Sequence, residues 1–255
     1  MSTIIRTIKK EFIIGFMLLL IPFTASLIFV MPVYHHFTTV GNVVSVRQLG
    51  VKGNVFFTYV SSGYTKNLYE KLALSWTQRD NIEFYPADKL EVEEEQEELE
   101  YEAERREQVI QNAVNALPAK DSDPESSKVE RIHEMIDKSA NYYGDSFGLM
   151  VAIGLVEESE RLDLSRNGRI KIAGTGAISR TMKVGPVGGV RYKVLTAERE
   201  GMQYFLVPDH DLKSPGTGLS NKEEAYQVVQ ERHLKIKIVP VNTVDDAVTY
   251  LKSLK

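Results

Sequence analysis

The 255-residue chain contains no cysteine, which excludes disulfide bonds, thiolate zinc sites and a cysteine nucleophile. Histidine is scarce, with five in the chain, and the stretch HEMID at 133–137 begins like the zinc motif HExxH but has aspartate where the second histidine belongs. The formal net charge is -4, so the clustered excess of lysine and arginine that nucleic acid binding requires is missing. Neither a zinc hydrolase of this motif nor a nucleic-acid-binding protein is indicated.

One long stretch lacks charged side chains altogether. Residues 12–34 contain no Asp, Glu, Lys or Arg, and about 20 apolar residues are enough to cross a hydrocarbon core of about 30 Å. A cleaved signal peptide is the alternative, but its apolar region would span about 7 to 15 residues before a small-residue cleavage site. Basic residues precede the stretch within residues 1–11, and none follows until Arg47. The positive-inside rule therefore predicts a single-pass cell-membrane protein with a cytoplasmic N-terminus and an extracellular C-terminal domain.

The next three segments differ in composition. Residues 35–90 contain β-branched and aromatic runs such as NVFFTYV between glycines, which predicts a small juxtamembrane module of strands joined by turns. Residues 91–117 predict an acidic helix, in which ten glutamates face only two arginines and apolar positions recur near heptad spacing. A solvated stalk and a calcium-binding segment are its two interpretations, and no EF-hand loop accompanies the acids. Residues 118–127, PAKDSDPESS, have the composition of a linker.

The clearest chemical signal is a serine between two glycines, in the run GDSFG at 144–148. The apolar residues that follow, through Val156, predict a buried helix. Backbone amides near Asp145 and Ser146, at the positive end of this helix, are suited to stabilise the oxyanion of a tetrahedral intermediate. The same two side chains are also good helix caps, and the pattern alone leaves both interpretations open.

A glycine-rich element, GPVGG at 185–189, runs into a predicted helix that starts at Val190 and carries Lys193. A lysine acts as a general base only when it is neutral near pH 7, which requires burial that lowers its pKa by about 3 units. Helical spacing does not distinguish Lys193 from Arg191 as the buried residue. The element lacks the Gly-Lys-Ser/Thr ending of a phosphate-binding loop, so no nucleotide and no other cofactor is expected.

The runs GDSFGLM, KIAGTGAI, VGPVGGVRYKVLTA and YFLVP, in this order and at this spacing, resemble the proteolytic domain of Lon-type peptidases over about 143–254. Farther upstream, GNVFFTYVSSGYTKN and FYPADKL resemble the membrane-proximal part of bacterial membrane-anchored Lon-like peptidases. That family usually carries a PDZ domain between these regions, and this chain has no room for one. The resemblance implies a serine endopeptidase for unfolded proteins or peptides, and the lack of an ATP-binding motif implies that it works without ATP.

The resemblance also assigns residues. It implies that Ser146 is the nucleophile, that Lys193 is the general base and that Thr175 hydrogen-bonds the lysine, although a turn-stabilising hydroxyl explains Thr175 equally well by spacing. Gly144 and Asp145 join Ser146 as support of the oxyanion hole. Lon-like domains often form hexameric rings, so a homo-oligomer is implied as well.

Three departures from the family pattern favour an alternative function. Aspartate stands at 145 where the family usually has proline, phenylalanine stands at 147 where it has alanine, and no strand precedes Ser146. A carboxylate beside the serine could pair with Lys193 and keep it protonated. The chain would then be a catalytically inactive Lon-like domain that acts as a membrane-tethered binding or assembly module.

The C-terminal segment 128–255 alternates between predicted helices and strands. They are helix 128–140, helix 147–156, strand 169–173, helix from 190, strand 203–207, helix 222–232 behind a Ser220-x-x-Glu223 capping box, strand 234–241 and helix 244–254. This order predicts an α/β (α+β) fold with parallel strands and crossover helices. Within it, Asp209-His210-Asp211 is either a metal-attracting cluster or a solvated loop, and the polar neighbours favour the loop.

Overall fold

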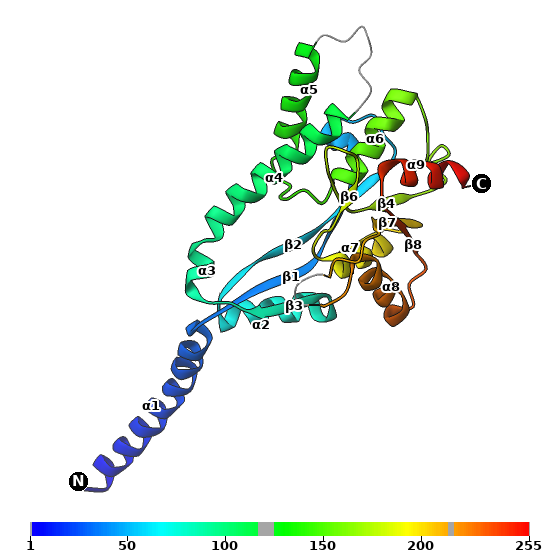
Figure 1. Cartoon of the computed structure of the whole chain (residues 1–255). Coiled ribbons are helices and arrows are strands. Elements are labelled where there is room, and N and C mark those ends of the chain that lie inside the picture. The colour runs from blue at the N-terminus through cyan, green and yellow to red at the C-terminus, as the bar shows by residue number, and fades with distance from the viewer. Residues whose placement is uncertain (1, 117–124, 214–216, 255) are drawn as a thin grey trace. The chain divides into compact units, whose positions relative to one another are not determined.

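The computed structural model describes residues 2–116, 125–213 and 217–254 (Figure 1). Of the predicted linker at 118–127, only 125–127 lie within the described residues. Contacts between residues divide the chain into two compact units. Unit 1 comprises Met1–Phe37 and Ser62–Glu93, and unit 2 comprises Thr38–Ser61 and Glu94–Lys255.

Unit 1 begins with a long apolar helix. Its elements are α1 (Ser2–Val30), the start of β1 (Pro32–Ser45), the end of β2 (Phe56–Asn67), α2 (Leu68–Gln78), the 3-10 turn η2 (Arg79–Asn81), β3 (Ile82–Pro86) and α3 (Lys89–Glu93). Lys10–Val30 is long and apolar enough to cross a membrane, although an N-terminal signal sequence meets the same two criteria. The predicted span was wrong about its end, because Pro32 disfavours helical geometry at Met31 and the chain turns there into β1.

Of the six-stranded sheet with the order β3-β1-β2-β4-β7-β8, unit 2 contains β4, β7, β8 and those residues of β1 and β2 that lie within 38–61. Its further elements are η1 (Val46–Leu49), α4 (Glu95–Asn115), α5 (Glu125–Lys138), α6 (Gly148–Glu160), β4 (Ile172–Gly174), β5 (Ala177–Ile178), β6 (Val184–Gly185), α7 (Val190–Arg199), β7 (Tyr204–Pro208), α8 (Asn221–Arg232), β8 (Lys237–Val241) and α9 (Val244–Ser253). Strands β2, β4, β7 and β8 run parallel, which confirms the fold class. The short antiparallel pair β5-β6 was not predicted.

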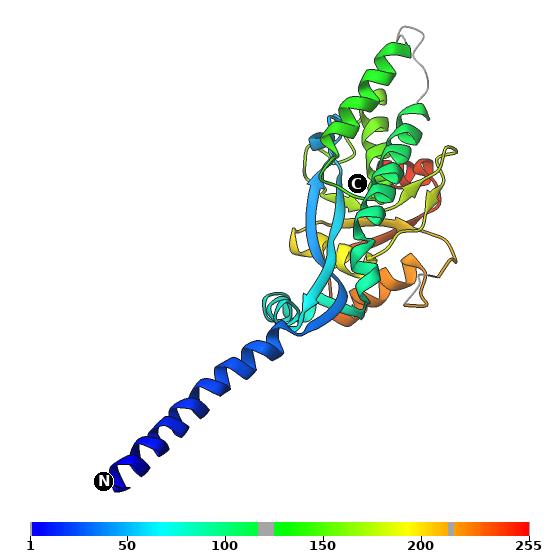
Figure 2. The same ribbon diagram turned by 90° about the vertical axis from the view of Figure 1, so that its left-hand side faces the viewer.

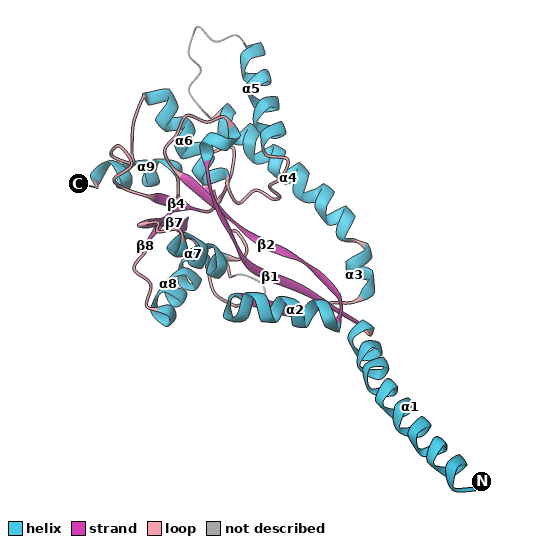
Figure 3. Cartoon of the chain, turned by 180° about the vertical axis from the view of Figure 1, so that it is seen from behind, coloured by secondary structure: helices cyan, strands magenta, loops and turns pink. Residues whose placement is uncertain are grey.

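Helices cover both faces of this sheet (Figure 3). Successive side chains of a strand point to opposite faces, and β7 shows the result: Leu206 packs in the cluster that includes α4, α6 and α9, while Phe205 and Val207 pack in the cluster that includes α7 and α8. A strand that is apolar on both faces is typical of a parallel sheet between two helical layers. Both faces of the run YFLVP are therefore buried, because β7 lies between two layers of helices.

The strands predicted as one juxtamembrane module at 35–90 are divided between the two units, because residues 38–61 belong to unit 2. Strand β2 pairs in parallel with β4, with Phe56 opposite Ala173 and Phe57 opposite Gly174. Phe57 is 1% exposed and its ring lies 5.5 Å from that of Phe147, measured between centroids. This part of the predicted module thus completes the sheet of the C-terminal domain.

The position of β2 within unit 2 predicts how substitutions change the stability of that unit. Phe57→Ala is expected to lower the free energy of unfolding of unit 2 by about 3 to 5 kcal/mol, because it opens a cavity between β2 and α6. Trp76→Ala in unit 1, where the side chain is 84% exposed, is the control and should stay within about 0.5 kcal/mol. Denaturant titration followed by circular dichroism measures both midpoints. Equal midpoints for the two variants would contradict the placement of β2 in the core of unit 2.

The acidic segment forms two helices, α3 and α4, and α4 lies beside α5 (Figure 2). A solvated stalk describes the glutamate-rich start of α4, where Leu99 and Glu100 are exposed. It is wrong for the last turns, since Val109, Ile110 and Ala113 are at most 2% exposed in the core of unit 2. The sequence did not reveal these buried turns, because the closely spaced apolar residues Val109, Ile110 and Ala113 follow a stretch in which glutamates outnumber apolar residues.

Candidate active site

Ser146 lies in the loop between α5 and α6, two residues before the helix begins at Gly148. Its carbonyl oxygen accepts hydrogen bonds from the Gly176 amide at 2.7 Å and from the Thr175 hydroxyl at 3.0 Å. The Leu149 amide donates in return to the Gly176 carbonyl at 2.8 Å. The turn that follows β4 therefore fixes the backbone of the serine, and the serine side chain is half-buried.

Lys193, in the first turn of α7, contacts the same threonine, Thr175. Its side chain is 3% exposed, and its ammonium nitrogen lies 3.2 Å from the hydroxyl oxygen of Thr175. Thr175 thus links the lysine to the serine backbone through two hydrogen bonds. Arg191, which helical spacing could not exclude, instead forms an ion pair with Glu231 at 2.7 Å.

The electrostatics around Lys193 combine two opposing effects. Burial lowers the pKa of Lys193 from 10.5 to about 8, and the nearby carboxylates of Asp145, Glu224 and Glu102 partly oppose this shift. Asp145 is bound elsewhere, since its Oδ2 accepts from Nη2 of Arg105 at 2.6 Å and from Nε at 3.1 Å. No ion pair of Lys193 occurs among the described residues. A lysine in this setting holds its proton less firmly than a solvated one.

Two site residues escaped the sequence analysis, namely Arg105 and Arg106 of α4. Arg105 binds Asp145, and Arg106 donates to the carbonyl oxygens of Ala140 and Tyr142 at 3.4 and 3.3 Å. Both therefore hold the loop that carries Ser146. The available signal was that they are the only basic residues within 91–117, although the contacts span some 34 to 40 positions and have no local pattern.

Gly144 occupies a position that requires glycine. Its φ is +77°, and a Cβ there would lie 2.5 Å from a carboxylate oxygen of Glu102. The backbone turn at Gly144 sets the direction of the next amides. The Gly148 amide donates to the Asp145 carbonyl at 3.0 Å, whereas the amides of Asp145 and Ser146 have no acceptor within the described ranges. An oxyanion hole is built from N-H groups that have no acceptor within the protein.

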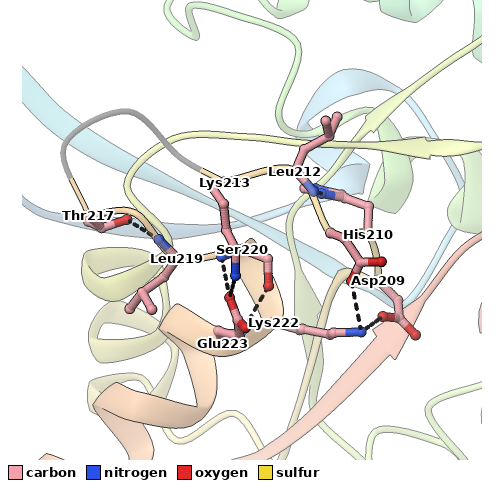
Figure 4. Close-up of polar contacts among 10 residues, drawn as sticks. Asp209, His210, Leu212, Lys213, Thr217, Leu219, Ser220, Lys222 and Glu223 are labelled. Atoms are coloured by element: carbon pink, nitrogen blue, oxygen red, sulfur yellow. Dashed lines mark hydrogen bonds and ion pairs between the residues drawn. The ribbon is translucent and has the colours of Figure 1, made fainter.

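Figure 4 shows the polar contacts of the loop that carries Asp209 and His210. The Lys222 ammonium pairs with the Asp209 carboxylate, and the His210 ring nitrogen lies 3.2 Å from the Asn221 side-chain oxygen. In the part of the chain that the structure describes, no three His, Asp or Glu side chains gather as a metal site. The interpretation as a polar loop agrees with these pairings.

Comparisons with known proteins agree with the arrangement. The family described as Lon protease (S16) C-terminal proteolytic domain matches residues 110–252. The peroxisomal Lon protease homolog 2 of Caenorhabditis elegans is 33% identical over 110 residues, which are 43% of this chain and 12% of that protein. Lon protease 2 of Hydrogenovibrio crunogenus is 37% identical over 95 residues, 36% of this chain and 10% of that protein. Lon protease of Trichlorobacter lovleyi is 29% identical over 103 residues, 40% and 11% respectively. The chain spans about a tenth of the length of these relatives.

Proposed function

Since the chain belongs to the Lon protease (S16) family through its C-terminal proteolytic domain, we propose that it is a membrane-anchored serine endopeptidase with a Ser-Lys dyad. Its substrates are unfolded proteins or peptides, and it cleaves them without ATP. The observation that carries the proposal is the buried Lys193, hydrogen-bonded to the threonine that also holds Ser146.

In the proposed reaction the Ser146 hydroxyl attacks the peptide carbonyl and passes its proton to the neutral amine of Lys193. Thr175 orients that amine. The amides of Asp145 and Ser146 donate to the oxyanion of the tetrahedral intermediate, whose collapse gives an acyl-serine while Lys193 returns the proton to the leaving amine. Water then attacks the ester with Lys193 again as base, which restores the serine and releases the new carboxylate.

The anchor in this proposal is α1. Its Lys10–Val30 stretch has 21 residues, and at a rise of about 1.5 Å per residue it spans about 30 Å, the thickness of a hydrocarbon core. The large apolar side chains along it are exposed, as in Phe12 at 77% and Leu19 at 68%. Contact with lipid acyl chains removes such an apolar surface from water. The positive-inside rule places the peptidase unit outside the cell, and the family resemblance implies a homo-oligomer.

A catalytically inactive, membrane-tethered binding module is the second candidate, and the residues that suggested it have other roles in the fold. Asp145 is paired with Arg105 rather than with Lys193, and Phe147 is 2% exposed against Phe57. A serine-reactive phosphonate decides between the two functions. We expect covalent labelling of Ser146 in the wild type and no labelling in Lys193→Ala. A wild type that stays unlabelled would favour the inactive module.

The proposed base predicts a pH dependence. Because burial sets the pKa of Lys193 at about 8, kcat/KM should rise with pH and reach half of its maximum near pH 8. Asp145 raises the pKa of Lys193, so Asp145→Asn should move this midpoint to lower pH. The control is Asp211→Asn, whose side chain is fully solvated and should leave the midpoint unchanged. A midpoint that moves upward in Asp145→Asn would contradict the assignment.

A further inference from the structure

Helix α2 in unit 1 presents apolar side chains to the outside. Tyr69, Leu72 and Trp76 are 63%, 47% and 84% exposed and recur at the spacing of one helix face. Lys71, on the opposite side, lies 2.7 Å from a ring nitrogen of His35 and 5.3 Å from the centre of the Phe84 ring. A helix on a water-soluble surface has the reverse arrangement, with its apolar stripe inward and its charges outward.

The stripe is continuous with the end of α1. An open apolar groove of unit 1 is lined by Phe29 together with five residues of α2, which are Tyr69, Leu72, Ala73, Ser75 and Trp76. Phe29 belongs to the last turn of the stretch Lys10–Val30, and α2 lies beside this end of α1 in Figures 1 and 3. In a helix that just spans the hydrocarbon core, Phe29 marks the edge of that core. With α1 as the proposed anchor, the stripe would lie at the depth of the lipid headgroups.

We propose that α2 is an interfacial helix, with Tyr69, Leu72 and Trp76 inserted among the lipids at the membrane surface that α1 reaches. This inference rests on the membrane anchor of the proposed function and not on its catalytic dyad. Tryptophan and tyrosine are enriched at this depth because their rings combine an apolar body with a polar edge. An apolar helix face bound there holds the segment parallel to the surface.

The chemistry of the groove favours lipid over a peptide. A bound peptide needs partners for its backbone amides and carbonyls. In the lining the Ser75 hydroxyl already donates to the Lys71 carbonyl at 2.8 Å, which leaves the ring edges of Tyr69 and Trp76 as the other polar groups of the side chains. The Thr77 hydroxyl, two positions later, donates in the same way to the Ala73 carbonyl at 3.0 Å. An acyl chain requires no hydrogen bonds from such a surface.

Trp76 is the only tryptophan of the chain, so its emission tests the proposal without a background. The full chain is reconstituted into vesicles of phosphatidylcholine and phosphatidylglycerol, whose acyl chains carry bromine either near the glycerol or near the chain end. We expect a blue-shifted emission and a larger loss of emission with bromine near the glycerol than with bromine near the chain end. The control Trp76→Phe/Tyr226→Trp places the reporter on α8, where Tyr226 is 44% exposed, and should show neither effect.

The outcomes separate this inference from the anchor. Chain that floats with the vesicles while Trp76 remains unquenched would overturn the interfacial helix and leave the anchor standing. Chain that fails to float would overturn the anchor and the inference together. Emission that shifts only when an unfolded peptide is added, or only as the chain concentration rises, would replace the lipid with a peptide or with a second copy. Peptidase activity need not be present in any of these measurements.

Discussion

Ser146→Ala is expected to reduce kcat/KM for a cleavable peptide by at least about 10⁴-fold, because the variant has no hydroxyl with which to form the acyl intermediate. The remaining amides of Asp145 and Ser146 can polarise a carbonyl, but they offer no covalent path. Hydrolysis of casein or of a fluorogenic peptide library by the full-length chain in detergent measures the effect. This loss of kcat/KM is larger than the loss expected from any substitution that only loosens the loop.

The matched control is Ser159→Ala, near the C-terminal end of α6, the helix that follows Ser146. The Ser159 hydroxyl donates to the Val156 carbonyl at 3.2 Å, a contact within α6. Its removal should leave kcat/KM unchanged. If Ser146→Ala keeps the wild-type rate, the nucleophile lies elsewhere in the chain; if both variants lose activity equally, the serine of the loop has no special role.

Local sequence patterns predicted the elements of the C-terminal half well. The capping box at the start of α8 is present, with Ser220 and Glu223 in their reciprocal hydrogen bonds, and α7 begins at Val190 as predicted. Both signals lie within a few neighbouring residues and depend on backbone geometry that the same residues create. The fold class followed from the alternation of these elements.

Long-range pairings explain what the sequence did not predict. Strand β2 joins the sheet by pairing with β4, so that Phe57 lies opposite Gly174, more than 100 positions away. Arg105 reaches Asp145 across 40 positions. Neither contact has a periodicity, and each depends on how helices and strands pack in three dimensions. For the candidate site, the resemblance of the runs around Ser146, Thr175 and Lys193 to the Lon family predicted these residues, and only the fold supplied the arginines that hold the loop.

Lys193→Met should abolish peptidase activity while making the fold more stable at neutral pH. The folded chain gives Lys193 a pKa of about 8 against an ordinary 10.5, and at about 1.4 kcal/mol per unit this difference corresponds to about 3 kcal/mol. The unfolded chain binds the proton more tightly, so the penalty is fully present below about pH 8 and disappears as the pH rises through 10.5. Methionine carries no charge, and the lost hydrogen bond to Thr175 offsets only about 1 kcal/mol of the gain.

The two effects of Lys193→Met distinguish a base from a structural residue. Loss of the proton acceptor should lower kcat by at least about 10³-fold, and denaturant titrations should show a higher midpoint than the wild type at pH 7, with the difference shrinking toward pH 10.5. Lys171→Met, which removes an exposed ammonium, is the control and should change neither quantity. If Lys193→Met is instead less stable than the wild type, the favourable interactions of the buried ammonium outweigh the cost of its desolvation. Such an amine stays protonated and cannot accept the serine proton.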